Sequence, residues 1–324
     1  MNKFLKKHKI PEVNYIGNPH ALEKAVKTKL EKYGYPHVPF TRKSIKEKEL
    51  IDALNEKFNL VSTRNILKNN HELDGYDEMK KVAVEFNGLF WHSEKCGKTK
   101  WYHYNKWKEC AEQGIKLYTI FEDEWNFARD KVIRFIFNNH FPDSCEIYRA
   151  SKTQFTEVDK NVARDFINAH HIQGGINLNI KKAYGLYKDN ELLSVMSFAP
   201  HHRRHNVVTM NRFCTKDKVR IHGGASKLIK NASQLIGQDI VTWSDNRWST
   251  GNAYLNSGWE KDGIVPVDYY WVDDRCSRRY SKQSRKKSAT GQPVEMTEKQ
   301  YNESLGWTRI WDCGKIRWIY KKES

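Results

Sequence analysis

The sequence predicts a mixed α/β protein with two folded domains behind a basic arm. Its 324 residues, 39% hydrophobic and 13% aromatic, are enough to form two cores. Strand-like segments alternate with amphipathic helical segments, and this alternation starts again after a turn-rich stretch at 142–144. We therefore expect an arm over 1–43, a first domain over 44–148 and a second domain over 149–324.

The first domain is expected to follow the order α-β-β-β-α-β-α. Ser44 and Glu47 have capping-box spacing before an apolar helix face, and a short polar turn separates two strands of a hairpin. The expected elements are a helix over 45–58, a strand near 60–62, hairpin strands over 72–76 and 81–86, a basic aromatic helix ended by Gly114, a buried strand over 115–121 and an amphipathic helix over 124–140.

The second domain shows the same kinds of signal without repeating the first. A glycine-rich turn precedes one of its helices, and a strand returns directly after that helix. The expected elements are a helix over 157–169, strands over 184–188, 192–199 and 207–214, a helix after the turn at 223–224, and a strand over 239–245. A tail with seven Lys or Arg follows over 275–287.

The charge balance indicates a polyanionic partner. The chain has 56 Lys or Arg against 39 Asp or Glu, a net charge of +17 and a pI near 9.4. Cations near phosphates release counterions, which favours nucleic acid as the partner. An acidic membrane surface would also suit this charge, but we find no apolar run of 18 residues and no signal-peptide pattern. We expect a cytoplasmic protein without a membrane partner.

The cysteines indicate a reducing compartment. The chain has six, and none forms a CxxC pair, so neither a disulfide framework nor a zinc knuckle is expected; they are residues 96, 110, 145, 214, 276 and 313.

The stretch VAVEFNGLFWHSEKC (82–96) holds the first candidate site. A hairpin turn centred near Met79 and Lys80 places Asp74 opposite Glu85, and alternation places Asn87 on the same face as Glu85. Two facing carboxylates repel each other unless a cation lies between them, and Mg²⁺ would fill that role. The alternative is a surface hairpin with solvated acids.

Asp74, VAVEFNGLFWH and the later GIKLYTIFEDEW resemble the very-short-patch repair branch of the PD-(D/E)xK nucleases. They are more closely similar to phage free-standing homing endonucleases built on that core. The resemblance covers about 44–138 and implies an αβββαβ nuclease core that hydrolyses phosphodiester bonds in duplex DNA with Mg²⁺ or Mn²⁺. It implies that Asp74, Glu85 and Glu47 hold the metal and that His92 acts near the scissile phosphate.

Two positions depart from that family. Asn87 stands where the motif has Lys, and an amide cannot accept a proton at neutral pH, so the base would be His92, Glu47 or metal hydroxide. Only Cys96 matches a ligand of the zinc site in the repair branch, so no zinc is expected. For His92 the alternative is a core histidine with one satisfied nitrogen; beside Asp74 and Glu85, a general acid/base role is favoured.

The expected contacts to DNA phosphates are basic residues spread over both domains. The alternative for the basic run over 275–287 is a solvent-exposed surface that binds no DNA. The candidates are Lys98, Lys100, Lys106, Arg203, Arg204, Arg247, Arg275, Arg278, Arg279, Lys282, Arg285, Lys286 and Lys287.

A second resemblance covers about 155–275. VRIHGGASKLI and SDNRWSTGNAYLNSGWE are similar to the glycine-rich turn and the closing segment of the GNAT acyltransferase fold. It implies that backbone N–H groups at a helix start bind the pyrophosphate of acetyl-CoA, at Arg220, Gly223, Gly224 and Ala225. The domain would be either an active acyltransferase or a GNAT-like scaffold that binds DNA. The second role is favoured because no clear catalytic acid is found.

Together these features predict a site-directed DNA endonuclease, encoded by a phage and acting in the host cytoplasm on double-stranded DNA. A single site cuts one strand, so a homodimer would allow double-strand cleavage. The first alternative is a GNAT-type acyltransferase that modifies nucleic acid and carries a degenerate nuclease domain. A further alternative is a module that only binds DNA.

Overall fold

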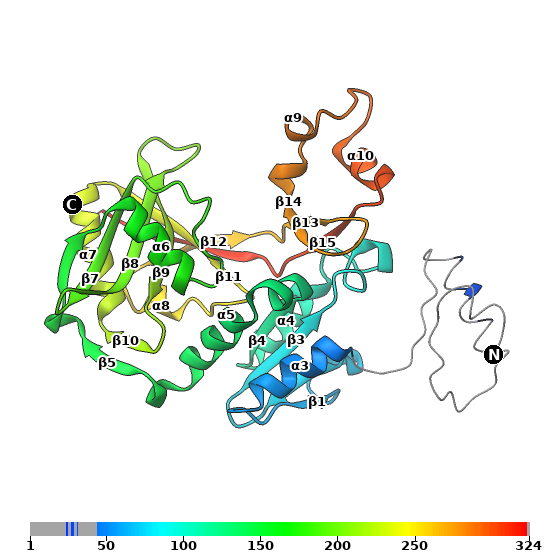
Figure 1. Cartoon of the computed structure of the whole chain (residues 1–324), viewed down its shortest axis with the longest axis horizontal. Helices are drawn as coiled ribbons and strands as arrows, with labels where there is room; N and C mark the ends of the chain where they lie inside the picture. Colours follow the sequence, from blue (N-terminus) through cyan, green and yellow to red (C-terminus); the bar gives the residue numbers. More distant parts are fainter. Residues whose placement is uncertain (1–23, 25–26, 29–30, 32–43, 323–324) are drawn as a thin grey trace.

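A computed structural model describes residues 24, 27–28, 31 and 44–322 (Figure 1). The predicted basic arm over 1–43 otherwise lies outside the described residues. In the described part, two sheets lie on either side of helix α5, and a smaller sheet projects beside them. No helix in this part is long and apolar enough to cross a membrane.

The first domain has the element order that the sequence predicts. Its four-stranded sheet has the order β1-β2-β3-β4; β3 and β4 are parallel and the other pairs antiparallel. Its elements are α3 (Ile45–Leu54), β1 (Val61–Thr63), η1 (Lys68–Asn70), β2 (Leu73–Asp77), β3 (Val82–Asn87), η2 (Glu94–Cys96), α4 (Tyr102–Glu112), β4 (Lys116–Phe121) and α5 (Glu122–His140).

Helix α3 ends four residues before the predicted boundary at 58. The reason is Asn55, whose side chain bonds both the N–H and the C=O of Leu60 at 2.7 and 3.2 Å. These bonds turn the chain toward β1 and leave Phe58 to pack in the core outside the helix.

Alternation along β3 divides its side chains between two layers. Val84 and Phe86 pack with α3 and α5, whereas Ala83 faces the cluster that includes Cys110 of α4. Because strand side chains alternate, Glu85 lies on the α4 side, and it is almost fully buried there.

The second domain contains a seven-stranded sheet of order β12-β16-β11-β9-β8-β7-β6 and a parallel pair, β10 and β5. The predicted strands and helices are present. The elements are η3 (Pro142–Ser144), β5 (Glu146–Arg149), η4 (Ala150–Lys152), β6 (Gln154–Glu157), α6 (Lys160–His170), β7 (Lys182–Lys188), β8 (Glu191–Pro200), β9 (Val207–Thr215), β10 (Val219–His222), α7 (Gly224–Ile236), β11 (Asp239–Asp245), α8 (Asn252–Leu255), β12 (Glu260–Val265) and β16 (Lys315–Tyr320).

The sheet splits between β9 and β11. The two strands are parallel and paired only from Val207 to Thr209 and from Asp239 to Val241. Beyond these residues β11 continues to pair with β16, while β9 continues to pair with β8. The C-terminal halves of β9 and β11 therefore diverge, and the gap between them is where a cavity forms.

An insertion separates β12 from β16. It contains β13 (Tyr269–Val272), β14 (Arg279–Ser281), η5 (Lys282–Arg285), α9 (Lys287–Thr290), α10 (Glu298–Ser304) and β15 (Thr308–Trp311), with the sheet order β14-β13-β15. Val272 and Ile310 pack on Leu89 and Phe121 of the first domain. The basic run over 275–287 is thus part of this insertion and not a C-terminal tail, because the aromatic strands β15 and β16 follow it.

Candidate functional site

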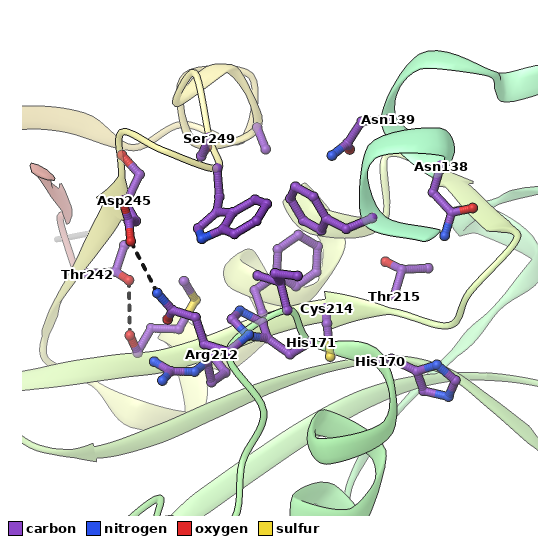
Figure 2. Close-up of a pocket in the computed structure, with 18 of the residues that line it drawn as sticks. Asn138, Asn139, His170, His171, Arg212, Cys214, Thr215, Thr242, Asp245 and Ser249 are labelled. Carbon is purple, nitrogen blue, oxygen red and sulfur yellow. Dashed lines mark hydrogen bonds between the residues drawn. The ribbon is translucent and has the colours of Figure 1, made fainter. Parts of the chain in front are cut away.

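A cavity of about 830 Å³ lies in the gap between β9 and β11 (Figure 2). Cavities of this size hold cofactors and small ligands. Strands β9 and β11 form two walls, the end of α6 a third, and the C-terminal half of α5 closes the side toward the first domain. The cavity is therefore shaped by both domains.

The lining of this cavity is basic. Asp217 and Asp245 are its only carboxylates in the described part of the chain, and Lys or Arg side chains outnumber them three to one: Lys131, Arg134, Arg212, Lys216, Arg220 and Lys315. A concave site with this balance of charges attracts an anionic ligand.

Arg220 connects the cavity to the glycine-rich turn. Its Nη2 donates to the carbonyls of Asn138 and Asn139 at the end of α5, at 2.6 and 3.2 Å, while its Nε is buried without an acceptor among the described residues. Residues 220–222 line the cavity, whereas Gly223, Gly224 and Ala225 lie directly beyond the lining. Of the four predicted cofactor contacts, Arg220 is the one placed in the cavity wall.

The turn requires glycine and leaves a helix start open. A Cβ on Gly224 would lie 2.8 Å from the Cβ of Ile221, too close for any other residue without movement. Gly223, at a φ of +75°, is the N-cap of α7 and supplies no side chain to the first turn. The first N–H groups of a helix have no partner within it, so those of α7 remain available to an anion.

Tyr254 lines the cavity, although we assigned it no role from the sequence. It lies on α8, its ring stacks on Trp318 with centroids 5.4 Å apart, and its hydroxyl lies near the side chain of Thr242. Burial raises the pKa of this hydroxyl, so it keeps its proton at neutral pH. The segment NAYLNSGWE contained the signal, but only the fold shows that this tyrosine reaches the cavity.

His171 is a neutral donor in the same cavity. Burial, followed by the nearby charges of Arg212 and Lys131, lowers its pKa to about 3. Its Nδ1 accepts from the N–H of Gln173 at 3.1 Å, so the proton of the neutral ring is on Nε2. At neutral pH this ring carries no charge and can donate from Nε2.

The predicted acid pair of the first domain is present. The hairpin register pairs Gly75 with Val84, which places Asp74 opposite Glu85. The carboxylate of Asp74 accepts from the N–H of Phe86 at 2.8 Å, and the N–H of Asp74 donates to Glu85 at 3.3 Å. The local hairpin signal was sufficient to find this pair.

Lys106 is the cation between these acids. Its Nζ lies 2.6 Å from Oε1 of Glu85. Burial, followed by the charge of Asp74, raises the pKa of Glu85 to about 8, and Lys106 opposes that shift. From the sequence we expected a cation between the two acids and suggested Mg²⁺; in the structure α4 supplies an ammonium group. Binding of Mg²⁺ or Mn²⁺ there stays an untested prediction.

The other three residues of the predicted catalytic set have structural contacts. His92 Nδ1 lies 3.1 Å from His103 Nε2, and burial followed by His103 lowers its pKa, so it is uncharged at neutral pH. Asn87 is buried and its amide faces the carbonyls of Glu85 and Ile120 at 3.4 and 3.5 Å.

Glu47 closes the predicted capping box, accepting from the N–H of Ser44 at 3.4 Å. Among the described residues, no group of three or more His, Cys, Asp or Glu side chains is arranged to hold a metal. The predicted three-acid metal site is therefore not assembled, although two of its members meet.

Three of the predicted DNA contacts have ion pairs inside the protein, and phosphate contact by them stays a prediction. Lys106 is held by Glu85, Arg247 by Glu124 and Asp245, and Arg279 by Asp123 and Glu124. Lys282 pairs with Asp268, and Arg285 bonds Asn302. Phosphate contact stays a prediction for these two and for Lys98, Lys100, Arg203, Arg204, Arg275, Arg278, Lys286 and Lys287.

Arg247 and Arg279 join the two domains. Arg247 Nη1 lies 2.8 Å from Glu124, which is at the start of α5, and its Nη2 lies 3.1 Å from Asp245. Arg279 lies 2.8 Å from both Asp123 and Glu124. Burial opposes ionisation of Glu124, but the two arginines outweigh it and lower its pKa to about 2. We call these five residues the interdomain ion cluster.

Solved structures similar to this chain include several acetyltransferases. A Bacillus subtilis acetyltransferase in complex with CoA aligns at a TM-score of 0.32 and 15% identity, over 52% of this chain and 99% of its own. Aminoglycoside 6'-acetyltransferase type Ii aligns at 0.30 and 10%, over 53% and 98%. An IAA acetyltransferase from Bacillus cereus aligns at 0.32 and 10%, over 52% and 99%. No protein-family model matches the sequence, and no curated protein matches it.

These alignments with acetyltransferases cover about half of this mixed α/β chain, at TM-scores of 0.30–0.32. At 10–15% identity the likeness concerns the fold and not a particular substrate. The prediction of a metal-dependent DNA endonuclease is corrected: these structures belong to enzymes of acyl transfer and not of phosphodiester hydrolysis, and none of them supports a nuclease core or a phage origin.

Proposed function

We propose that this protein transfers an acyl group from acyl-CoA to an acceptor in a nucleic acid. The observation that carries the proposal is the basic cavity of about 830 Å³ where β9 and β11 diverge, which reaches Arg220 beside the open start of α7. A nucleic acid is proposed as the partner because the chain has a net charge of +17 and because basic loops such as 201–205 are exposed.

The residues present fit an acyl-CoA. The buried Nε of Arg220 lacks an acceptor, and the α7 turn admits glycine alone, so an anionic diphosphate has donors on two sides. Beyond Thr209, β9 is no longer paired with β11, which leaves a strand edge toward the cavity for the amide groups of the pantetheine arm.

When bound, acyl-CoA supplies a thioester whose acyl carbon an amine can attack. Tyr254 holds a proton at its hydroxyl at neutral pH, beside Thr242, and is the donor available to a leaving thiol. His171 holds a proton at Nε2 and remains uncharged, so it offers a hydrogen bond without adding charge. Helix α5 covers the cavity from the side of the first domain and limits the access of water.

Tyr254→Phe tests this role. We expect the rate of transfer of labelled acetyl groups from acetyl-CoA to DNA or RNA to fall about 100-fold, because proton transfer to the leaving group is lost. Calorimetry should show acetyl-CoA affinity within about twofold of wild type, since the variant loses no charge. Tyr301→Phe, on α10 and outside both cavities, is the matched control and should transfer at the wild-type rate. Equal rates for Tyr254→Phe and wild type would contradict the assigned role.

A further inference from the structure

A second cavity, of about 480 Å³, adjoins the first. It lies between the start of α5, the segment around Trp248, and the strands β13 and β14 of the insertion. Five residues line both cavities, so the two share part of their wall; they are Ile172, Gln173, Arg212, Trp248 and Lys315. The two cavities are therefore direct neighbours.

The second cavity has an excess of hydrogen-bond donors. Four cations line it, Arg212, Arg247, Arg279 and Lys315, against two carboxylates, Asp123 and Glu124. Both carboxylates are already bonded to arginines of the interdomain ion cluster. Among its lining residues three buried donors have no acceptor in the described part of the chain: Arg247 Nε, Trp248 Nε1 and Arg279 Nη1. Such a lining complements a ligand rich in oxygen and negative charge.

Arg212 lies where the two cavities meet. Its side chain donates to two backbone carbonyls, those of Asn211 at 2.8 Å and Gly174 at 3.4 Å. It has no ion pair with a carboxylate among the described residues, although the other arginines of this cavity do. A half-buried guanidinium without a counter-ion favours an anionic ligand, and its planar fork fits phosphate.

We infer that the second cavity is the acceptor site and that it takes one nucleotide unit, with its phosphate on Arg212. This inference rests on the proposed acyl transfer. The volume lies in the range of cavities that hold small ligands, and the ring of Tyr270 in its wall offers a surface for a base. A base in a duplex cannot reach such a site, so the acceptor nucleotide would be unpaired or flipped out of its helix.

The probes are the four deoxynucleoside 5'-monophosphates and the matching nucleosides, titrated into the full-length protein by calorimetry. Arg212→Gln should weaken binding of the monophosphate at least tenfold, since a charged hydrogen bond is lost, and change nucleoside binding less than about twofold. Arg64→Gln is the matched control: Arg64 directly follows β1, its side chain is exposed and pairs with Glu72, and it lines neither cavity. It should bind like wild type.

If Arg212→Gln fails to fold, Arg212→Lys replaces it in the test. We expect its affinity for the monophosphate to lie between those of wild type and Arg212→Gln. Equal monophosphate affinity in wild type and either variant would overturn the inference, and so would competition between monophosphate and acetyl-CoA for one site. If the wild-type protein binds acetyl-CoA but no monophosphate, the acceptor site is contradicted and the acyl-CoA site is not. If it binds monophosphate through Arg212 but no acetyl-CoA, acyl transfer and the acceptor role are contradicted. The nucleotide site itself would then still be supported.

Discussion

Replacing Arg247 by alanine is expected to lower the free energy of unfolding by about 3–5 kcal/mol. The guanidinium is almost fully buried and bonds two carboxylates, Glu124 and Asp245. Its removal leaves both acids in the domain interface without this partner, and an uncompensated buried charge costs more than the pair itself contributes. Urea unfolding at pH 7 measures the loss.

The same cluster makes stability depend on pH. Because the pKa of folded Glu124, about 2, lies below its ordinary value of 4.5, the native state favours the ionised form. Its contribution is therefore complete above pH 4.5 and is lost as the pH falls from there toward 2. The wild-type protein should lose stability across this window more steeply than Arg247→Ala, in which much of the shift is absent.

Lys108→Ala is the control for a pair that contributes little. Lys108 and Glu112 form an exposed i,i+4 pair, with both side chains more than half exposed. Its loss should change the free energy of unfolding by about 0.5 kcal/mol or less. If Arg247→Ala costs no more than Lys108→Ala, the interdomain ion cluster does not stabilise the fold as described.

Gly251→Ala is expected to cost about 2–4 kcal/mol of stability. Gly251 is the N-cap of α8 at a φ of +84°, a conformation that disfavours a side chain, and an added Cβ would overlap the indole of Trp318. Trp318 is buried in the second-domain core and stacks on Tyr254, which lines the cavity. A shift of the Trp318 indole would therefore displace Tyr254. Thermal unfolding measures the cost, and acetyl-CoA affinity should fall with it.

Gly291→Ala separates the effect of backbone strain at positive φ from the effect of the clash with Trp318. Gly291 has a similar φ of +63°, but nothing lies within 4 Å of its added Cβ. Only the backbone strain should remain, at about 1–2 kcal/mol. Equal losses at Gly251 and Gly291 would show that Trp318 does not constrain the start of α8.

Local sequence signals predicted much of the fold. The Ser44–Glu47 spacing predicted the cap of α3, and the turn near Met79 predicted the pairing of Asp74 with Glu85. The glycines at 223–224 predicted the turn before α7. Each of these signals lies within a dozen residues of what it determines, so its geometry follows from backbone rules alone.

Long-range contacts were not predictable in the same way. Lys106 is 21 positions from Glu85, and Arg247 is 123 positions from Glu124. Residue type alone does not show whether a Lys or Arg will be buried against an acid or will contact a phosphate. For that reason Lys106, Arg247 and Arg279 were assigned to DNA. Only the packing of α4 and α5 shows where these charges are neutralised.

The role of the first domain also differs from expectation. The resemblance to nucleases implied that the first domain is a separate catalytic unit. In the structure its helix α5 forms a wall of both cavities and carries two acids of the interdomain ion cluster, Asp123 and Glu124. Trp248 of the second domain packs within the core of the first, beside Tyr118 and Phe135. The candidate site therefore depends on both domains.

Titration of the full-length protein with acetyl-CoA, followed by calorimetry, tests the proposed cofactor site. We expect one site per chain, with affinity at least tenfold lower in Arg220→Gln because a charged contact to the diphosphate is lost. Absence of binding by the folded wild-type protein, or equal affinity for wild type and Arg220→Gln, would contradict the cofactor site proposed here.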